Sequence, residues 1–260
     1  MDIHQLAKQA RTFTKTLEEQ KQALGDEDFM WYPYGTLTNF SHLDRLLKGE
    51  HRELLALAGD LPIADIGAAD GDAAFFLESL GYDVHAIDYP PTNNNGCRGI
   101  RALKQARESA VTLHDINLDA HFELPGEKYG LAFFLGILYH LKNPFGAMEN
   151  LSRLTHHALL STRITGHNVA KAGRGVNGLN HECVELDDIP AAYLVDAYET
   201  NNDPTNYWIF TNAGLKRLLD RCGWDVLDFM SVGATGKFDP ATAEGDERAF
   251  CLIRSRHFQA

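Results

Sequence analysis

The sequence predicts an α/β fold with a doubly wound, mostly parallel sheet, and two observations carry that prediction. From about residue 60 onward, short apolar runs alternate with amphipathic stretches, which is the pattern of parallel strands joined by helices. Near the end of the chain, two apolar runs follow one another without a helix between them, which predicts a hairpin and an antiparallel edge. We therefore expect seven strands, of which the last is antiparallel.

The N-terminal segment is expected to cover this sheet from outside. Apolar residues recur at helical spacing over residues 3–24, which predicts an amphipathic helix. An aromatic cluster follows at 28–34 and is either a strap that anchors the segment or a wall of a substrate pocket. A second helix is predicted over 42–59, with Gly59 as its stop.

The elements of the sheet follow in order. Strands are expected at 62–65, 83–89, 111–116, 130–138 and 157–164, with two more starting at 224 and at 248. Helices are expected over 73–80, 101–110 and 143–154, the last with Asn143 as N-cap and Pro144 in its first turn. Residues 165–206 interrupt the alternation and contain a short helical insertion over 186–199. A further helix is expected after Thr211, its predicted N-cap.

The turn after the first strand, Asp65-x-Gly67-x-Ala69-x-Gly71, indicates a nucleotide-type cofactor. About twenty residues later the second strand ends in Asp88, whose carboxylate can accept hydrogen bonds from both hydroxyls of a ribose. The acids of this turn would repel a pyrophosphate, so the pattern favours an adenosine cofactor with a cationic centre. Ala69 replaces a glycine here, and its side chain calls for an αR or β backbone.

This turn resembles motif I of class I S-adenosylmethionine-dependent methyltransferases, D-x-G-x-G-x-G. The resemblance covers residues 60 to 255 and implies a Rossmann-like fold with seven strands. A looser resemblance, carried by Leu138-Tyr139-His140-x-x-x-Pro144 and by residues 208–224, points to the tRNA wobble-uridine carboxymethyltransferase and its relatives. The general family implies a cofactor-binding half at 59–164, an N-terminal cap at 1–58, a lid-like insertion at 165–206 and a C-terminal part at 207–260.

The resemblance also implies a role for each residue of the cofactor site. Gly67 and Gly71 let the backbone approach the methionine part, with Asp65 beside them. Asp88 holds the ribose, Asp115 accepts from the adenine amino group, and Ile116 packs on the ring.

The end of the fourth strand, at Leu135, lies where open α/β sheets bind ligands. Tyr139 and His140 follow it and are the catalytic candidates. His140 is either a general base for the acceptor or a residue that packs on the next helix, since neutral imidazole suits proton transfer near pH 7. Tyr139 is either a floor for the sulfonium or a hydrogen-bond donor. Further polar candidates are Arg163, His167, Asn180, His181 and Glu182, and no metal site is expected.

The sequence therefore predicts an S-adenosylmethionine-dependent methyltransferase acting on an oxygen or nitrogen of a small or medium polar metabolite. One alternative is a tRNA wobble-uridine (carboxy)methyltransferase, although residues 31–35 lack the lysine that a carboxylated cofactor calls for. A second alternative is a cofactor-binding protein without catalysis. The formal charge of −12 argues against wide contact with nucleic acid, although Arg98, Arg101, Lys104 and Arg107 could form one basic face.

The remaining expectations concern the setting of the chain. Its 260 residues, 44% of them apolar, can bury a full core. No apolar run approaches the roughly 18 to 20 residues of a membrane span and no signal peptide is evident, which predicts a cytoplasmic protein without membrane contact. Four scattered cysteines suggest neither disulfides nor zinc. The N-terminal helix could serve as a cap or as a homodimer contact.

Overall fold

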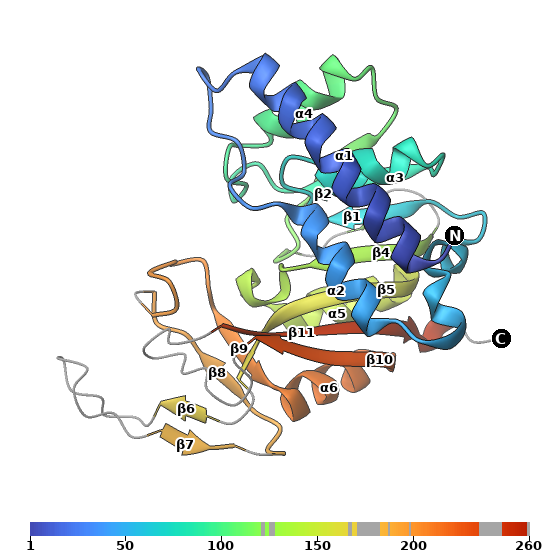
Figure 1. Cartoon of the computed structure of the whole chain (residues 1–260). Helices are drawn as coiled ribbons and strands as arrows, with labels where there is room; N and C mark the ends of the chain where they lie inside the picture. The colour runs from blue at the N-terminus through green and yellow to red at the C-terminus, as the bar shows by residue number, and fades with distance from the viewer. Residues whose placement is uncertain are drawn as a thin grey trace.

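The computed structural model describes residues 1–120, 123–124, 128–165, 168–170, 183–186, 188–197, 199–233 and 246–258. A twisted sheet runs through its centre (Figure 1) in the order β3-β2-β1-β4-β5-β11-β10. The bounds of these strands are Thr112–Asp115 for β3, Val84–Asp88 for β2, Ile63–Ile66 for β1, Tyr129–Leu135 for β4, Thr155–Thr165 for β5, Glu247–Ser255 for β11 and Trp224–Gly233 for β10.

The strand directions confirm the predicted doubly wound sheet. Strands β1 to β5 pair in parallel, whereas β11 pairs antiparallel with both β5 and β10. The last strand is thus antiparallel, as the sequence predicts. It lies inside the sheet rather than at its edge, because β10 takes the edge position and runs in the same direction as β5.

Two short strands extend the sheet beyond the predicted seven. β8 (Ala192–Leu194) pairs antiparallel with β9 (Trp208–Thr211), which pairs in parallel with the end of β5. The predicted helix over 186–199 is therefore wrong, and the strand at 208–211 was not predicted. Pro190 cannot donate inside a helix, and the Ala191 backbone bonds with Thr211 instead, so a tertiary partner replaces the local one. In a separate two-stranded sheet, β6 (Asn168–Ala170) pairs antiparallel with β7 (Cys183–Glu185).

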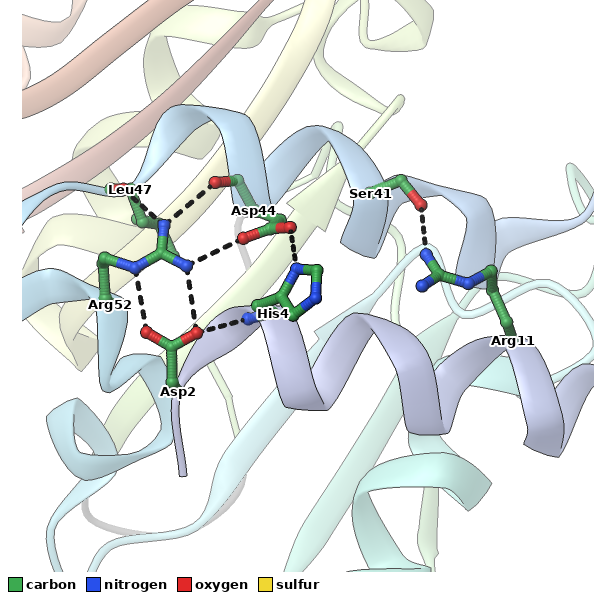
Figure 2. Close-up of polar contacts among 7 residues, drawn as sticks. All are labelled: Asp2, His4, Arg11, Ser41, Asp44, Leu47 and Arg52. Carbon is green, nitrogen blue, oxygen red and sulfur yellow. Dashed lines mark hydrogen bonds and ion pairs between the residues drawn. The ribbon is translucent and has the colours of Figure 1, made fainter.

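The N-terminal helix α1 (Ile3–Leu24) forms as predicted, but the second predicted helix is broken. α2 spans Asn39–Leu46, and two 3₁₀ turns, Gly49–Arg52 and Leu54–Ala58, replace the rest of the expected 42–59 helix. Leu47 takes an extended backbone, with a φ of −75° and a ψ of 137°, and ends α2. The first of these turns carries Arg52, which links it to the start of α1 and to α2 (Figure 2). Arg52 donates to Asp2 at 2.8 and 2.9 Å and to Asp44 at 2.9 Å.

Helices cover both faces of the sheet (Figure 1). One core joins the sheet to α1, α2, α3 (Asp72–Ser79) and α4 (Arg98–Ala106), and the other joins it to α5 (Pro144–Leu154) and α6 (Asn212–Arg221). The predicted N-caps are confirmed, because Asn143 accepts from the Gly146 N–H and Thr211 from the Gly214 N–H. Within the described ranges, every helix is too short or too polar to span a membrane.

Candidate functional site

The turn between β1 and α3 forms a narrow cradle at the carboxyl edge of the sheet. Gly67 has a φ of +72°, and a Cβ at this position would lie 2.1 Å from Ile137. Asp65 is buried and accepts from the Ala74 N–H at 3.0 Å, so it fixes the start of α3. Burial raises the pKa of Asp65 to about 7, with Asp88 adding to the shift. Asp65 therefore stabilises the turn from its buried side.

Ala69 stands in place of the middle glycine, and the backbone conformation expected for it is wrong. Its φ is +52°, in the left-handed region rather than in the αR or β region. The Ala69 N–H donates to the Asp88 carboxylate at 2.8 Å, and the Asn93 amide donates to the Ala69 carbonyl at 3.4 Å. These two bonds hold the alanine in a conformation that normally favours glycine.

Asp88 closes β2 with its carboxylate directed at the same turn. It accepts from Tyr89 N–H at 2.7 Å on Oδ1, and from Ala69 N–H at 2.8 Å and Asn93 at 3.0 Å on Oδ2. Burial raises its pKa, and these donors oppose that shift. A carboxylate offers about four acceptor positions, so one ribose hydroxyl can bind directly. A second hydroxyl would have to displace the Asn93 amide.

Asp115 lies next to Asp88 because β2 and β3 pair in register. One nitrogen of Arg101, Nη2, lies 2.9 Å from both of its carboxylate oxygens. A small cleft between these side chains is lined by Ala86, Asp88, Cys97, Ile100, Arg101, Leu113, His114 and Asp115. An adenine amino group approaching Asp115 would therefore meet Arg101 first. Ile116 is half-buried and packs on the α5 side of the sheet.

Tyr139 lies just beyond the end of β4, which Leu135 closes. Its ring is buried, with the Arg163 and Arg248 guanidinium carbons 5.3 and 5.9 Å from the ring centroid. The ring of His140 lies 4.1 Å from that of Tyr139, centroid to centroid. The two catalytic candidates are thus in contact with each other, and Tyr139 also contacts a pair of cations.

The hydrogen bonds of His140 fix which ring nitrogen carries the proton. Its Nδ1 lies 3.0 Å from both the Thr205 carbonyl oxygen and the Thr205 hydroxyl. A carbonyl can only accept, and the hydroxyl already donates to Asp203 at 2.6 Å. Nδ1 is therefore the donor, which leaves Nε2 of the neutral ring as an acceptor. Burial lowers the pKa of His140, and nearby Arg163 and Arg248 lower it further, against the opposing effect of Thr205 and Asp203.

The aromatic segment 28–34, here called the strap, reaches the same site from the N-terminal side. The Tyr32 N–H donates to Asp70 at 2.7 Å, and Lys21 of α1 pairs with Asp72 at 2.9 Å. Burial raises the pKa of Tyr32 to about 12, with Tyr139 as the next largest contributor. The strap is therefore anchored on the cradle, and one of its rings lies near Tyr139.

Several residues of this site were not predicted. Asn93 supports Ala69 and Asp88, Asn95 bonds to Asp70 at 2.8 Å, and Lys21 joins α1 to the turn. The run of three asparagines at 93–95, which begins five residues after Asp88, was the available signal. Arg248 gave none, because it is one of two arginines on an ordinary strand.

The other candidates are placed as follows. Arg163 joins the cluster at Tyr139, whereas His167, Asn180, His181 and Glu182 lie outside the described residues. Among the residues described, no group of three or more His, Cys, Asp or Glu side chains could hold a metal ion.

Comparisons with known proteins identify the fold. No protein-family model and no curated protein matches the chain. The N-terminal domain of EvdMO1, solved with S-adenosylhomocysteine bound, matches 98% of this chain and 98% of its own at TM-score 0.55 and 15% identity. TehB from Haemophilus influenzae matches over 80% of this chain and 62% of its own, at TM-score 0.51 and 16% identity. The [4+2]-cyclase SpnF matches over 77% and 76%, at TM-score 0.50 and 14% identity.

These likenesses define the class of fold and nothing finer. The chain has a Rossmann-like methyltransferase fold, with the site described above at the carboxyl edge of its sheet. The same fold holds S-adenosylhomocysteine in one of these proteins and is the fold of a cyclase in another.

Proposed function

We propose that this protein is an S-adenosylmethionine-dependent methyltransferase acting on an oxygen or nitrogen of a small polar metabolite. The observation that carries the proposal is the convergence of the Gly67 cradle, Asp88 and Asp115 at one edge of the sheet. The similar domain of EvdMO1 holds S-adenosylhomocysteine, the product that such a transfer leaves behind, and was also solved in the presence of D-fucose, a small polar molecule.

The residues fit this cofactor by their own geometry. The cradle at Gly67 has no room for a side chain, and Asp88 keeps one acceptor position for a hydroxyl. S-adenosylmethionine, when bound, supplies a methyl group on a cationic sulfur. An in-line displacement from such a sulfur depends mainly on alignment and on exclusion of water.

The chain's own contribution to the reaction lies at Tyr139, His140 and the strap. Nε2 of His140 can accept the proton of the attacking hydroxyl or amine, because Nδ1 is committed to Thr205. Tyr139 is buried beside it, and the role proposed for Tyr32 of the strap is to cover the same region. Together they would hold the acceptor in line and keep water out.

A tRNA acceptor is the weaker candidate because the basic residues of α4 are engaged within the protein. Arg98 donates to the Asp28 carbonyl, Arg101 to Asp115, and Lys104 to the carbonyls of Ser109 and Val111. Arg107 donates to Gln20 and lies over two phenylalanine rings. This face has few free cations for a phosphate backbone.

The proposal is tested by incubating the protein with methyl-labelled S-adenosylmethionine and fractions of a metabolite extract. We expect S-adenosylhomocysteine to accumulate and the label to appear in a product of low mass. Label found only in tRNA would support the alternative acceptor. A protein that binds the cofactor and transfers label to no fraction would contradict the enzymatic proposal.

A further inference from the structure

Two arginines face each other across neighbouring strands beyond the end of β4. Arg163 of β5 and Arg248 of β11 are direct register partners. Leu159 and Phe250, which share their strand faces, belong to the core beneath α1 and α2, so both arginines point to that side. Both guanidinium groups lie within 6 Å of the Tyr139 ring centroid, at 5.3 and 5.9 Å.

The cluster carries an excess of positive charge. Among the residues that the structure describes, one carboxylate, that of Asp246, accepts from Arg163 at 2.8 Å and from Arg248 at 3.1 Å, and its own side chain is half exposed. His42 and His140 face the same cluster, and burial lowers the pKa of each imidazole, so both are neutral near pH 7. Among these groups two positive charges therefore face one negative charge.

Arg163 also has an unused donor. Its side chain is 9% exposed, and its Nε is buried without a hydrogen-bond partner among the described residues. A buried donor without a partner costs on the order of 1 to 3 kcal/mol. Buried polar groups are almost always satisfied, so this donor at the Tyr139 cluster is free to take a partner from a bound molecule.

We propose that Arg163 and Arg248 bind an anionic group, a carboxylate or a phosphate, of the molecule that receives the methyl group. The inference rests on the proposed function and adds the chemical class of the acceptor. A planar guanidinium fork can bind two oxygens of either group at once, which an ammonium does not. Tyr139 and His140 lie beside the pair, so the anion would anchor the acceptor next to the reacting centre.

The position of the pair separates it from the cofactor. Asp88, Asp115 and the Gly67 cradle belong to β1, β2 and β3, whereas the arginines lie on β5 and β11, with β4 between the two groups. Neighbouring strands are about 4.8 Å apart, so Arg163 lies two strands, or roughly 10 Å, from β1. This distance places Arg163 and Arg248 in the half of the site that we assign to the acceptor.

The test is a calorimetric titration of inorganic phosphate into the protein, with and without S-adenosylhomocysteine, alongside the Arg163→Gln variant. We expect Arg163→Gln to weaken phosphate binding at least tenfold and to leave S-adenosylhomocysteine affinity within threefold. The Arg163→Lys variant keeps the charge and loses the fork. Its phosphate affinity should therefore lie between those of the wild type and Arg163→Gln. The control is Arg254→Gln, which removes an exposed β11 arginine paired with Asp225 and should change neither affinity.

Equal phosphate affinity in the wild type and in a folded Arg163→Gln variant would overturn the proposal, as would a wild type that does not bind phosphate. A large loss of S-adenosylhomocysteine affinity in Arg163→Gln would also overturn it, because the arginine would then serve the cofactor. If S-adenosylhomocysteine fails to bind the wild type while phosphate binding still depends on Arg163, the proposed function fails and the anion site stands.

Discussion

At the scale of single residues, Ala69 shows how the turn depends on its neighbours. A left-handed conformation costs an alanine about 1 kcal/mol or more, and Asp88 and Asn93 hold it there. We expect Ala69→Gly to raise the free energy of unfolding by roughly 0.5 to 1 kcal/mol, since relief of strain exceeds the added entropy of the unfolded chain. Urea denaturation measures the change.

The matched control is the neighbouring residue. Ala68 is buried and lacks a positive φ, so Ala68→Gly should lower the free energy of unfolding. If Ala69→Gly destabilises the protein as much as Ala68→Gly does, the left-handed backbone at Ala69 is not a source of strain.

His140 provides the second prediction at this scale. As a general base it should contribute a factor of roughly 10² to 10⁴ to kcat, so His140→Ala should lower kcat by that factor and leave cofactor affinity unchanged. Burial holds the pKa of His140 below its ordinary value of 6.5. The neutral, active form therefore prevails at pH 7, and kcat should fall only as the pH drops below about 6.5. A pH–rate profile measures both effects.

The control for this prediction is His4→Ala, which changes an exposed histidine of α1 and should leave kcat unaltered. An acid limb that persists unchanged in His140→Ala would make His140 a packing residue bound to Thr205. Alignment alone would then have to account for the rate.

At the scale of elements, the strap is the part whose role the contacts define best. Its hydrogen bond to Asp70 supports the interpretation as an anchor, and the contribution of Tyr139 to the raised pKa of Tyr32 is what the interpretation as a pocket wall expects. Removing residues 1–35 would also delete α1, which buries Ile3, Leu6 and Leu17, so a point variant is the sharper test.

We expect Tyr32→Ala to lower kcat at least tenfold and to leave S-adenosylhomocysteine affinity within a few fold, because the role proposed for the strap is to cover the acceptor. Steady-state kinetics and calorimetry give the two numbers. Met30→Ala, at a strap residue that is 75% exposed, is the control and should alter neither. A Tyr32→Ala variant that loses cofactor affinity instead would assign the strap to the cofactor site.

The sequence predicted the strands and helices of the sheet because their apolar patterns are local. It failed where a distant partner decides the structure. β8 forms because Ala191 bonds with Thr211 of β9, and the second helix stops because the backbone becomes extended at Leu47. Neither the β9 pairing nor the extended backbone at Leu47 can be read from a periodic pattern.

The residues of the candidate site also divide into those that a local pattern predicts and those that depend on a distant partner. Asp65, Gly67, Gly71, Asp88 and Asp115 fall at the ends of predicted strands, so their convergence at one edge could be predicted. Arg248 could not, because it reaches Tyr139 through a register between β5 and β11 that brings together residues 85 positions apart in the sequence. The Arg101 contact with Asp115 was also unforeseen, since it depends on side-chain geometry.

At the scale of the whole molecule, the proposed methyltransferase function depends on S-adenosylmethionine binding at the carboxyl edge of the sheet. The most direct measurement is calorimetric titration of S-adenosylhomocysteine into the wild type, Asp88→Asn and the control Asp83→Asn, whose side chain is 70% exposed. One charge-assisted hydrogen bond is worth about 1.5 to 3 kcal/mol, so Asp88→Asn should weaken binding at least tenfold. Asp83→Asn should bind like the wild type. A folded wild type that does not bind S-adenosylhomocysteine, or a folded Asp88→Asn that binds it equally well, would contradict the account.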